Sequence, residues 1–195
     1  MTYLFDLGNV LLAFDFIPAL NSLKGENPEP DALEQIIQKK DAFESGKISL
    51  PDFITFLRKV LDYKGDDKDI ITAWNSIFTK IPQTFELAKS LKKEGHRLII
   101  FSNINPIHAP FCVKEFGLLE IFDHAVFSYE IGEIKPYDNF FVRAFDKFQI
   151  IAEDTIYIDD LPDNIAAGKR HGLLSFCYDY EKHNDLVTWL KDPKN

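Results

Sequence analysis

Three carboxylates stand at the ends of two apolar runs that lie far apart in the chain. Asp6 follows the run 3–5, and Asp159 and Asp160 follow the run 155–158. Neighbouring buried carboxylates repel each other and lose hydration, so they need a cation or hydrogen-bond donors beside them. Mg²⁺ prefers a few carboxylate oxygens together with water and phosphate oxygens. The sequence therefore predicts a magnesium site if the fold brings the two runs together.

Other polar residues that could act on phosphate follow further apolar runs. Ser102 and Asn103 come after the run 97–101, and Lys135 stands in the segment 132–136, which contains glycine and proline. Phosphoryl transfer needs a nucleophile, a cation beside the transferring oxygens and donors for the spreading negative charge. A carboxylate, an ammonium, a hydroxyl and an amide together meet these needs.

The elements that must position these residues alternate between strand and helix patterns. Short runs rich in β-forming residues predict buried strands over 3–5, 97–101, 125–127, 155–158 and 174–178. Helical spacing with start and stop signals predicts helices over 82–94 and 164–171. This alternation is typical of an α/β fold with a doubly wound, Rossmann-like parallel sheet. Ligands of such sheets bind beyond the carboxyl ends of the strands, which is where the polar residues stand.

The segment 15–80 has a different pattern, with helical periodicity and no convincing strand. Capping-box sequences at 31–34 and 49–52 predict the starts of two helices. We therefore expect an α/β core of residues 1–14 and 81–195, with a small helical cap inserted over its active edge.

Four segments of the chain resemble the haloacid dehalogenase-like hydrolase superfamily. The matching residues, in the order that the superfamily uses, are Asp6-Leu7-Gly8-Asn9-Val10, Ser102-Asn103, Lys135-Pro136 and Asp159-Asp160. The helical insert after the first motif also matches the position of that superfamily's cap. The chain is most similar to the branch with α-glucose-1-phosphate phosphatase and the phosphatase domain of soluble epoxide hydrolase. The cap run Glu44-Ser45-Gly46-Lys47-Ile48-Ser49 also resembles that branch.

The resemblance implies a nucleophile and a set of metal ligands. Asp6 would form an aspartyl-phosphate, and its other oxygen would hold Mg²⁺. Asp160 and the carbonyl of Gly8 would be further ligands. Asp159 would lie either on the metal or directly behind it.

The resemblance also implies how the phosphate is held. Ser102 and Asn103 would hydrogen-bond the phosphoryl oxygens, and Lys135 would neutralise both the phosphate and the aspartyl anion. Apart from the resemblance, Asn105, His108 and Asn164 either line this pocket or are only its neighbours.

One position departs from the superfamily's commonest pattern. The residue two after the nucleophile is usually an aspartate that donates and accepts protons, and here it is Gly8. Such acid–base help is typically worth about 10²- to 10⁴-fold in rate. Either another group such as Asp15 supplies the proton, or the substrate has a leaving group that needs little protonation.

Composition narrows the partners and the compartment. A net charge of −9 argues against a nucleic-acid partner and against an anionic membrane, since both call for clustered Lys and Arg. Cys112 and Cys177 stand in apolar contexts without metal-ligand spacing, which is typical of buried thiols in a reducing compartment. The N-terminal apolar run is too short for a signal segment or a membrane span. We expect a cytoplasmic protein.

Together these features predict a Mg²⁺-dependent phosphatase that acts on a small phosphorylated metabolite, most plausibly a sugar phosphate. Two alternatives stay open. The first is a metal-independent haloacid dehalogenase with the same aspartate-ester chemistry, and the second is a regulatory or binding protein that has lost turnover with its acid. The sequence makes no prediction about the oligomeric state.

Overall fold

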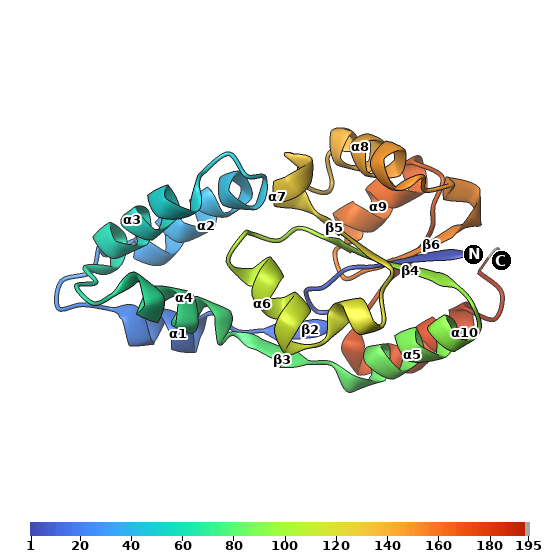
Figure 1. Ribbon diagram of the computed structural model, residues 1–195, viewed down its shortest axis with the longest axis horizontal. Coiled ribbons are helices and arrows are strands. Elements are labelled where there is room, and N and C mark those ends of the chain that lie inside the picture. Colours follow the sequence, from blue (N-terminus) through green and yellow to red (C-terminus); the bar gives the residue numbers. More distant parts are fainter. Residues whose placement is uncertain (194–195) are drawn as a thin grey trace.

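The computed structural model describes residues 1–193, and its main feature is a five-stranded sheet in the order β5-β4-β1-β6-β7 (Figure 1). The strands are β1 (Thr2–Phe5), β4 (Arg97–Ser102), β5 (His124–Phe127), β6 (Thr155–Asp159) and β7 (Leu174–Cys177). Each neighbouring pair is parallel. The predicted α/β fold with a Rossmann-like parallel sheet is confirmed.

Helices cover both faces of this sheet. One face packs against α5 (Pro82–Lys93), α6 (His108–Glu115) and α10 (His183–Trp189). The other packs against α7 (Ser128–Ile131), α8 (Asp138–Phe148) and α9 (Pro162–Arg170). Short 3₁₀ helices lie at Leu118–Glu120, Ala152–Asp154 and Tyr180–Lys182. Because both faces are covered, strand residues of either parity are buried, which explains the continuous apolar runs.

The chain between β2 (Leu12–Phe14) and β3 (Phe78–Lys80) forms a group of helices with an apolar cluster of its own. These helices are α1 (Ile17–Leu23), α2 (Ala32–Glu44), α3 (Leu50–Leu61) and α4 (Asp67–Asn75). Phe43, Leu57 and Trp74 are buried in this cluster, which Ile107 joins from the core side. A separate cluster supports our proposal that residues 15–80 form a cap.

The start of α2 differs from its prediction. The Ser49 hydroxyl accepts a hydrogen bond from the Asp52 N–H at 3.3 Å and caps α3, as predicted. Asp31 makes no such bond at the start of α2. Its carboxylate accepts from Gln35 Nε2 at 2.8 Å instead, because a side chain one turn along the helix competes for it.

The prediction that residues 15–80 contain no strand is wrong at one place. β3 (Phe78–Lys80) pairs antiparallel with β2 (Leu12–Phe14). Three residues are too few to show a period-two pattern in the sequence. This pairing joins the segment that enters the helical group to the segment that leaves it, and it brings Phe14 to the edge of the sheet's active end.

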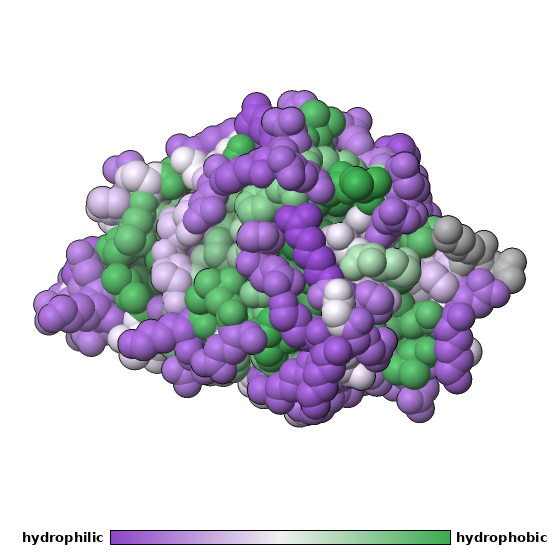
Figure 2. All heavy atoms as spheres, turned by 45° about the vertical axis from the view of Figure 1, so that its right-hand side comes forward, coloured by the Kyte–Doolittle hydropathy of each residue, from purple (hydrophilic) through white to green (hydrophobic). Residues whose placement is uncertain are grey.

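The visible surface is largely polar. The face in Figure 2 is mostly hydrophilic, with apolar side chains in separate patches. Within residues 1–193, no helix is both long and apolar enough to cross a membrane.

Helix α9 lies unusually close to β6 and β7 at one glycine. A Cβ atom added at Gly168 would lie 2.6 Å from Tyr157 Cδ1 and 2.9 Å from Ser175 Oγ. Neither a buried ring nor the adjacent strand can move away without disturbing the packing. This contact sets the position of the helix that follows Asp159 and Asp160.

We predict that Gly168→Ala destabilises the protein by about 1–2 kcal/mol, because overpacking outweighs the gain in helix propensity. Urea unfolding measures the change. Ala166→Gly, at an exposed site on the same helix, reports the propensity effect alone. If Gly168→Ala raised stability by as much as Ala166→Gly lowers it, close packing at Gly168 would be refuted.

Candidate active site

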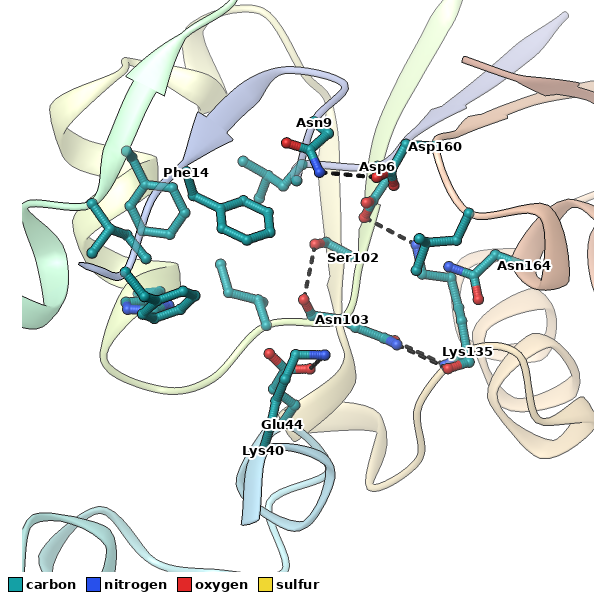
Figure 3. Close-up of a pocket in the computed structure, with 18 residues that line it drawn as sticks. Asp6, Asn9, Phe14, Lys40, Glu44, Ser102, Asn103, Lys135, Asp160 and Asn164 are labelled. Carbon is teal, nitrogen blue, oxygen red and sulfur yellow. Dashed lines mark hydrogen bonds and ion pairs between the residues drawn. The ribbon is translucent and has the colours of Figure 1, made fainter. Parts of the chain in front are cut away.

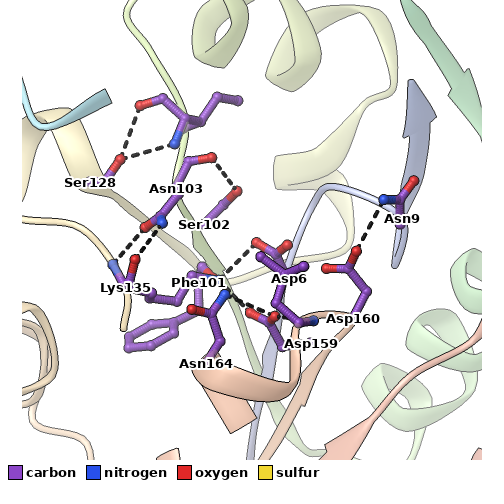
Figure 4. A network of polar contacts seen from close by, with 12 residues as sticks. Asp6, Asn9, Phe101, Ser102, Asn103, Ser128, Lys135, Asp159, Asp160 and Asn164 are labelled. Carbon is purple, nitrogen blue, oxygen red and sulfur yellow. Dashed lines mark hydrogen bonds and ion pairs between the residues drawn. The ribbon is translucent and has the colours of Figure 1, made fainter. Parts of the chain in front are cut away.

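Asp6, Asp159 and Asp160 meet at the carboxyl ends of adjacent strands. β1 and β6 are paired with Phe5 opposite Ile158, and the Asp6 N–H donates to the Ile158 carbonyl at 2.9 Å. One carboxylate oxygen of each aspartate lies within 4.8 Å of the others (Figure 4). The fold therefore brings together the two runs that the sequence separates.

The Lys135 ammonium lies between two of these carboxylates. It donates to Asp6 Oδ1 at 2.9 Å, to Asp159 Oδ2 at 2.6 Å and to the Phe101 carbonyl at 2.7 Å. The side chain is buried, so burial alone would lower the pKa of Lys135. The attraction of Asp159 and Asp6 outweighs burial, and the pKa is raised. Lys135 is therefore a fixed positive charge whose three protons are all used.

Both oxygens of Asp159 are occupied by partners from this chain. Oδ2 accepts from Lys135 and from the Tyr157 hydroxyl. Oδ1 accepts from the Leu161 N–H at 2.9 Å and from Asn164 Nδ2 at 3.0 Å. These four donors use the lone pairs that a metal would need, so the structure favours a position for Asp159 behind the metal.

The other two aspartates are less well compensated. Burial raises the pKa of Asp6 to about 7, with Asp159 and Asp160 adding to the rise and Lys135 opposing it. Burial and Asp159 also raise the pKa of Asp160. With three carboxylates around one ammonium, the site carries an excess of two negative charges when all are ionised. A divalent cation fits this donor set in both charge and oxygen chemistry.

Asn9 was not among the predicted site residues, yet it orients Asp160. Its Nδ2 donates to Asp160 Oδ2 at 3.0 Å. Its backbone has a positive φ of 51°, in a region that asparagine tolerates better than most residues. The sequence signal for this role was an asparagine in the turn directly after β1.

The side chain of Asn103 holds Lys135 in place. Asn103 Nδ2 donates to the Lys135 carbonyl at 2.9 Å, and Asn103 Oδ1 accepts from the Lys135 N–H at 2.8 Å. Each polar end of this side chain thus has one partner in the chain. Nδ2 keeps a second N–H, so the contact of Asn103 with a phosphate, beside the buried hydroxyl of Ser102, stays a prediction.

These groups line one end of a cavity of about 300 Å³ (Figure 3). Asp6, Ser102 and Lys135 form its inner wall, while Lys40 and Glu44 of α2 face them from the cap. The two α2 residues were not predicted as site residues, because helical periodicity does not show which polar side chain faces a distant strand end. The resemblance of the run from Glu44 to a phosphatase branch was the only signal.

Comparison with known proteins identifies the family. Residues 1–172 match the family model described as a haloacid dehalogenase-like hydrolase. The chain belongs to the haloacid dehalogenase-like hydrolase family.

Two curated relatives of this hydrolase are phosphatases. The D-ribitol-5-phosphate phosphatase of Bacteroides thetaiotaomicron is 26% identical over 186 residues, which cover 88% of each chain. The glyceraldehyde 3-phosphate phosphatase of Pyrococcus furiosus is 27% identical over 152 residues, or 74% of this chain. That match spans 63% of the Pyrococcus protein's length.

Solved structures of family members share the whole fold. A predicted family hydrolase from Porphyromonas gingivalis has a TM-score of 0.82 at 25% identity, and the match covers 98% of this chain and 97% of the other. A family enzyme from Bacteroides thetaiotaomicron also has a TM-score of 0.82, at 24% identity, with 96% and 97% covered.

In this hydrolase an aromatic ring lies where a side chain at position 8 would extend. A Cβ added at Gly8 would lie 3.0 Å from Phe14 Cε1, so the ring from β2 occupies the space beside this residue. Asp15, the other candidate proton donor, accepts from the Ile17 N–H at 2.9 Å at the start of α1. Within the described chain Asp15 does not line the cavity, so the interpretation of Asp15 as the proton donor is not supported.

His108 lines the cavity and links the core to the cap. Its Nε2 lies 3.0 Å from the Trp74 carbonyl, and its Nδ1 lies 3.0 Å from Asn105 Nδ2. A carbonyl only accepts, so Nε2 carries the proton and Nδ1 accepts from Asn105. Burial lowers the pKa of His108 to about 3, and the ring is neutral at pH 7.

This buried neutral ring predicts acid sensitivity. The unfolded chain takes up a proton at His108 near its ordinary pKa of about 6.5, whereas the folded chain does so only near 3. Between these two pH values the free energy of unfolding decreases as the pH decreases, by about 1.4 kcal/mol for each pH unit. His108→Gln should flatten the dependence of unfolding free energy on pH between 7 and 5, relative to wild type. His124→Gln, at an exposed site, should not, and equal slopes for wild type and His108→Gln would contradict the interpretation.

Proposed function

We propose that this hydrolase is a Mg²⁺-dependent phosphatase that cleaves a compact phosphomonoester through an aspartyl-phosphate on Asp6. The observation that carries the proposal is the position of Asp6. Its carboxylate lies at the inner end of the cavity, with Lys135 on one oxygen and Asp160 nearby. A nucleophilic carboxylate with a cation beside it is what an in-line displacement at phosphorus requires.

Asp6 and Asp160 would hold the metal, with the carbonyl of Gly8 as a third protein ligand. Asp159 would stay behind them, since its oxygens already accept four hydrogen bonds. When bound, Mg²⁺ supplies positive charge to the phosphoryl oxygens and to the crowded carboxylates.

The other residues support the displacement by orientation and charge. Asp6 Oδ2, which lies away from the Lys135 bond, attacks phosphorus while Lys135 holds Oδ1. The hydroxyl of Ser102 and the backbone N–H of Asn103 would donate to the phosphoryl oxygens. The paired bonds between Asn103 and the Lys135 backbone fix the cation's loop to the end of β4.

We propose a phosphorylated sugar or polyol as the substrate class. Two relatives are named for small phosphate esters of this kind, D-ribitol 5-phosphate and glyceraldehyde 3-phosphate. A cavity of about 300 Å³ is at the lower end of the range for small-molecule sites and suits a compact ester. We also propose a cytoplasmic location. Cys112 is a buried thiol as predicted, whereas Cys177 was predicted to be buried and is exposed, and an exposed free thiol suits a reducing compartment.

The two alternatives from the sequence are less well supported. A metal-independent dehalogenase would leave the excess negative charge around Asp6 and Asp160 without compensation. A binding protein without turnover would keep the same geometry, and activity measurements distinguish it.

We expect purified protein with Mg²⁺ to hydrolyse para-nitrophenyl phosphate, whose leaving group needs no proton. Asp6→Asn should lower kcat by at least about 10³-fold, because no covalent intermediate can form. Release of nitrophenolate measures the rate, and circular dichroism checks the fold of the variant. An inactive wild type, or an active Asp6→Asn protein, would refute the phosphatase proposal.

Metal binding should be visible without turnover. Mg²⁺ at about 100 times its Kd should stabilise the folded protein by about 2.7 kcal/mol, which raises Tm. Asp160→Asn should remove most of this increase, whereas Asp163→Asn, at an exposed neighbouring site, should keep it. Equal Mg²⁺ effects on the two variants would rule out Asp160 as a ligand.

A further inference from the structure

The cleavage of an alkyl phosphate needs a proton at the leaving oxygen, and Gly8 cannot supply one. The carboxyl-bearing residues that line the cavity within the described chain are Asp6, Asp160 and Glu44. The first two belong to the strand-end cluster that holds phosphate and metal. Glu44 approaches from the opposite side, on the cap helix α2 (Figure 3).

We propose that Glu44 is the catalytic acid and base of this enzyme, replacing the aspartate that most family members carry two residues after the nucleophile. The proposal rests on the proposed phosphatase function. It assigns the proton transfer to the cap side of the cavity, where the leaving group of a phosphate held at Asp6 would lie.

The backbone of Glu44 is fixed to the core. The Ser128 hydroxyl donates to the Glu44 carbonyl at 2.6 Å and accepts from the Ile104 N–H at 2.9 Å. Ile104 directly follows Asn103, so one hydroxyl ties the end of α2 to the loop after β4 (Figure 4 shows Ser128 beside Asn103).

A glycine tightens the same contact. Gly46 has a φ of +69°, and a Cβ there would lie 2.7 Å from the Tyr129 carbonyl oxygen. Only a residue without a side chain lets the end of α2 approach α7 so closely. The run Glu44-Ser45-Gly46 thus places one carboxyl side chain at a defined point of the cavity wall.

The side chain of Glu44 is suited to hold and to lose a proton. It is buried, and burial raises its pKa above the ordinary range while Lys40 opposes the rise. Lys40 Nζ lies 3.2 Å from Glu44 Oε2, and its side chain is half exposed. This ammonium can stabilise the carboxylate that remains after the proton has left.

The charged groups around Glu44 act in both directions. Lys40 and Asp41 lie on its own helix, and Lys135 faces it from the core. Asp6 and Asp160 line the same cavity. Two cations and three anions thus surround it, so the proton on Glu44 depends on burial more than on a net local charge.

The proposed steps balance in atoms and electrons. Asp6 forms a bond to phosphorus while the bond from phosphorus to the leaving oxygen breaks, and Glu44 gives its proton to that oxygen. Glu44, now a carboxylate, then takes a proton from water as the water oxygen bonds to phosphorus and the Asp6–phosphorus bond breaks. Glu44 ends protonated, and the products are an alcohol and inorganic phosphate.

Other groups in the cavity are poorer donors. His108 is neutral, its one N–H is bonded to the Trp74 carbonyl, and burial holds its pKa near 3. The three protons of Lys135 are committed to Asp6, Asp159 and a carbonyl. Neither can act without breaking the contacts that hold the site together.

The test compares two leaving groups in Glu44→Gln, which keeps the shape and loses the transferable proton. The alkyl ester is the fastest one found in a screen of sugar and polyol phosphates, and the aryl ester is para-nitrophenyl phosphate. We expect the single-turnover rate of alcohol release from the alkyl ester to fall by about 10²- to 10⁴-fold. The single-turnover rate of nitrophenolate release should change by less than about threefold, because that step needs no proton from Glu44, whereas the later hydrolysis of the aspartyl-phosphate slows equally for both esters. A retained first-turnover release of nitrophenolate also shows that the variant is folded.

The pH profile gives a second measurement. For the alkyl ester, the single-turnover rate of wild type should fall as the pH rises through the raised pKa of Glu44, and Glu44→Gln should lack this limb. Glu34→Gln, at an exposed site on the same helix, is the matched control and should keep both the rate and the limb.

Several results would overturn the proposal. Equal losses of the single-turnover rate on both esters would indicate a structural role, and a change confined to KM would indicate substrate recognition without proton transfer. A wild type that cleaves the aryl ester and no alkyl ester in the screen would lack a working acid. Wild-type activity that depends on Asp6 and not on Glu44 refutes this proposal alone, whereas no activity on either ester refutes the phosphatase function as well.

Discussion

The site depends on one buried ammonium, Lys135, which neighbouring carboxylates and a carbonyl hold in place. Burying a charge is costly unless partners surround it, and here Asp6 and Asp159 supply the opposite charge. Asp159 can face Lys135 only because Tyr157, Leu161 and Asn164 also donate to it. The fixed position of the Asp6 carboxylate therefore follows from a chain of paired groups. The groups in it come from the carboxyl ends of β1 and β6, from the start of α9 and from the loop that carries Lys135.

Much of this arrangement can be predicted from the sequence because it depends on local regularities. Apolar runs of strand length predict β1, β4, β5, β6 and β7, and the rule that ligands bind at carboxyl ends selects the polar residue after each run. Asp6, Ser102, Asp159 and Asp160 follow from these two steps alone. Lys135 lies in a loop without hydrophobic periodicity, so its expected role beside Asp6 was inferred from the family resemblance.

What the sequence could not predict depends on contacts across long separations. Asn9 meets Asp160, and Ser128 meets Glu44, only after the sheet and the cap are assembled. The three residues of β3 are too few to show an alternating hydrophobic pattern. The Asp31 carboxylate accepts a hydrogen bond from Gln35 and none from the backbone at the start of α2. The two bonds between the Asn103 side chain and the Lys135 backbone likewise form only when the sheet is assembled.

There is a physical reason for the proposed proton donor, Glu44, to lie across the cavity from Asp6. An acid placed beside Asp6 would share the strong field of Lys135 and of the metal, which favours ionised carboxylates and makes a proton harder to keep. Glu44 lies across the cavity from that field and is buried, and both conditions favour the protonated form. A donor on a separate group of helices would normally be poorly fixed. The hydroxyl of Ser128 removes this difficulty, because it bonds the backbone of Glu44 to the same loop that follows the phosphate-binding strand. The proton donor can thus be electrostatically separate from the nucleophile and still be geometrically tied to it.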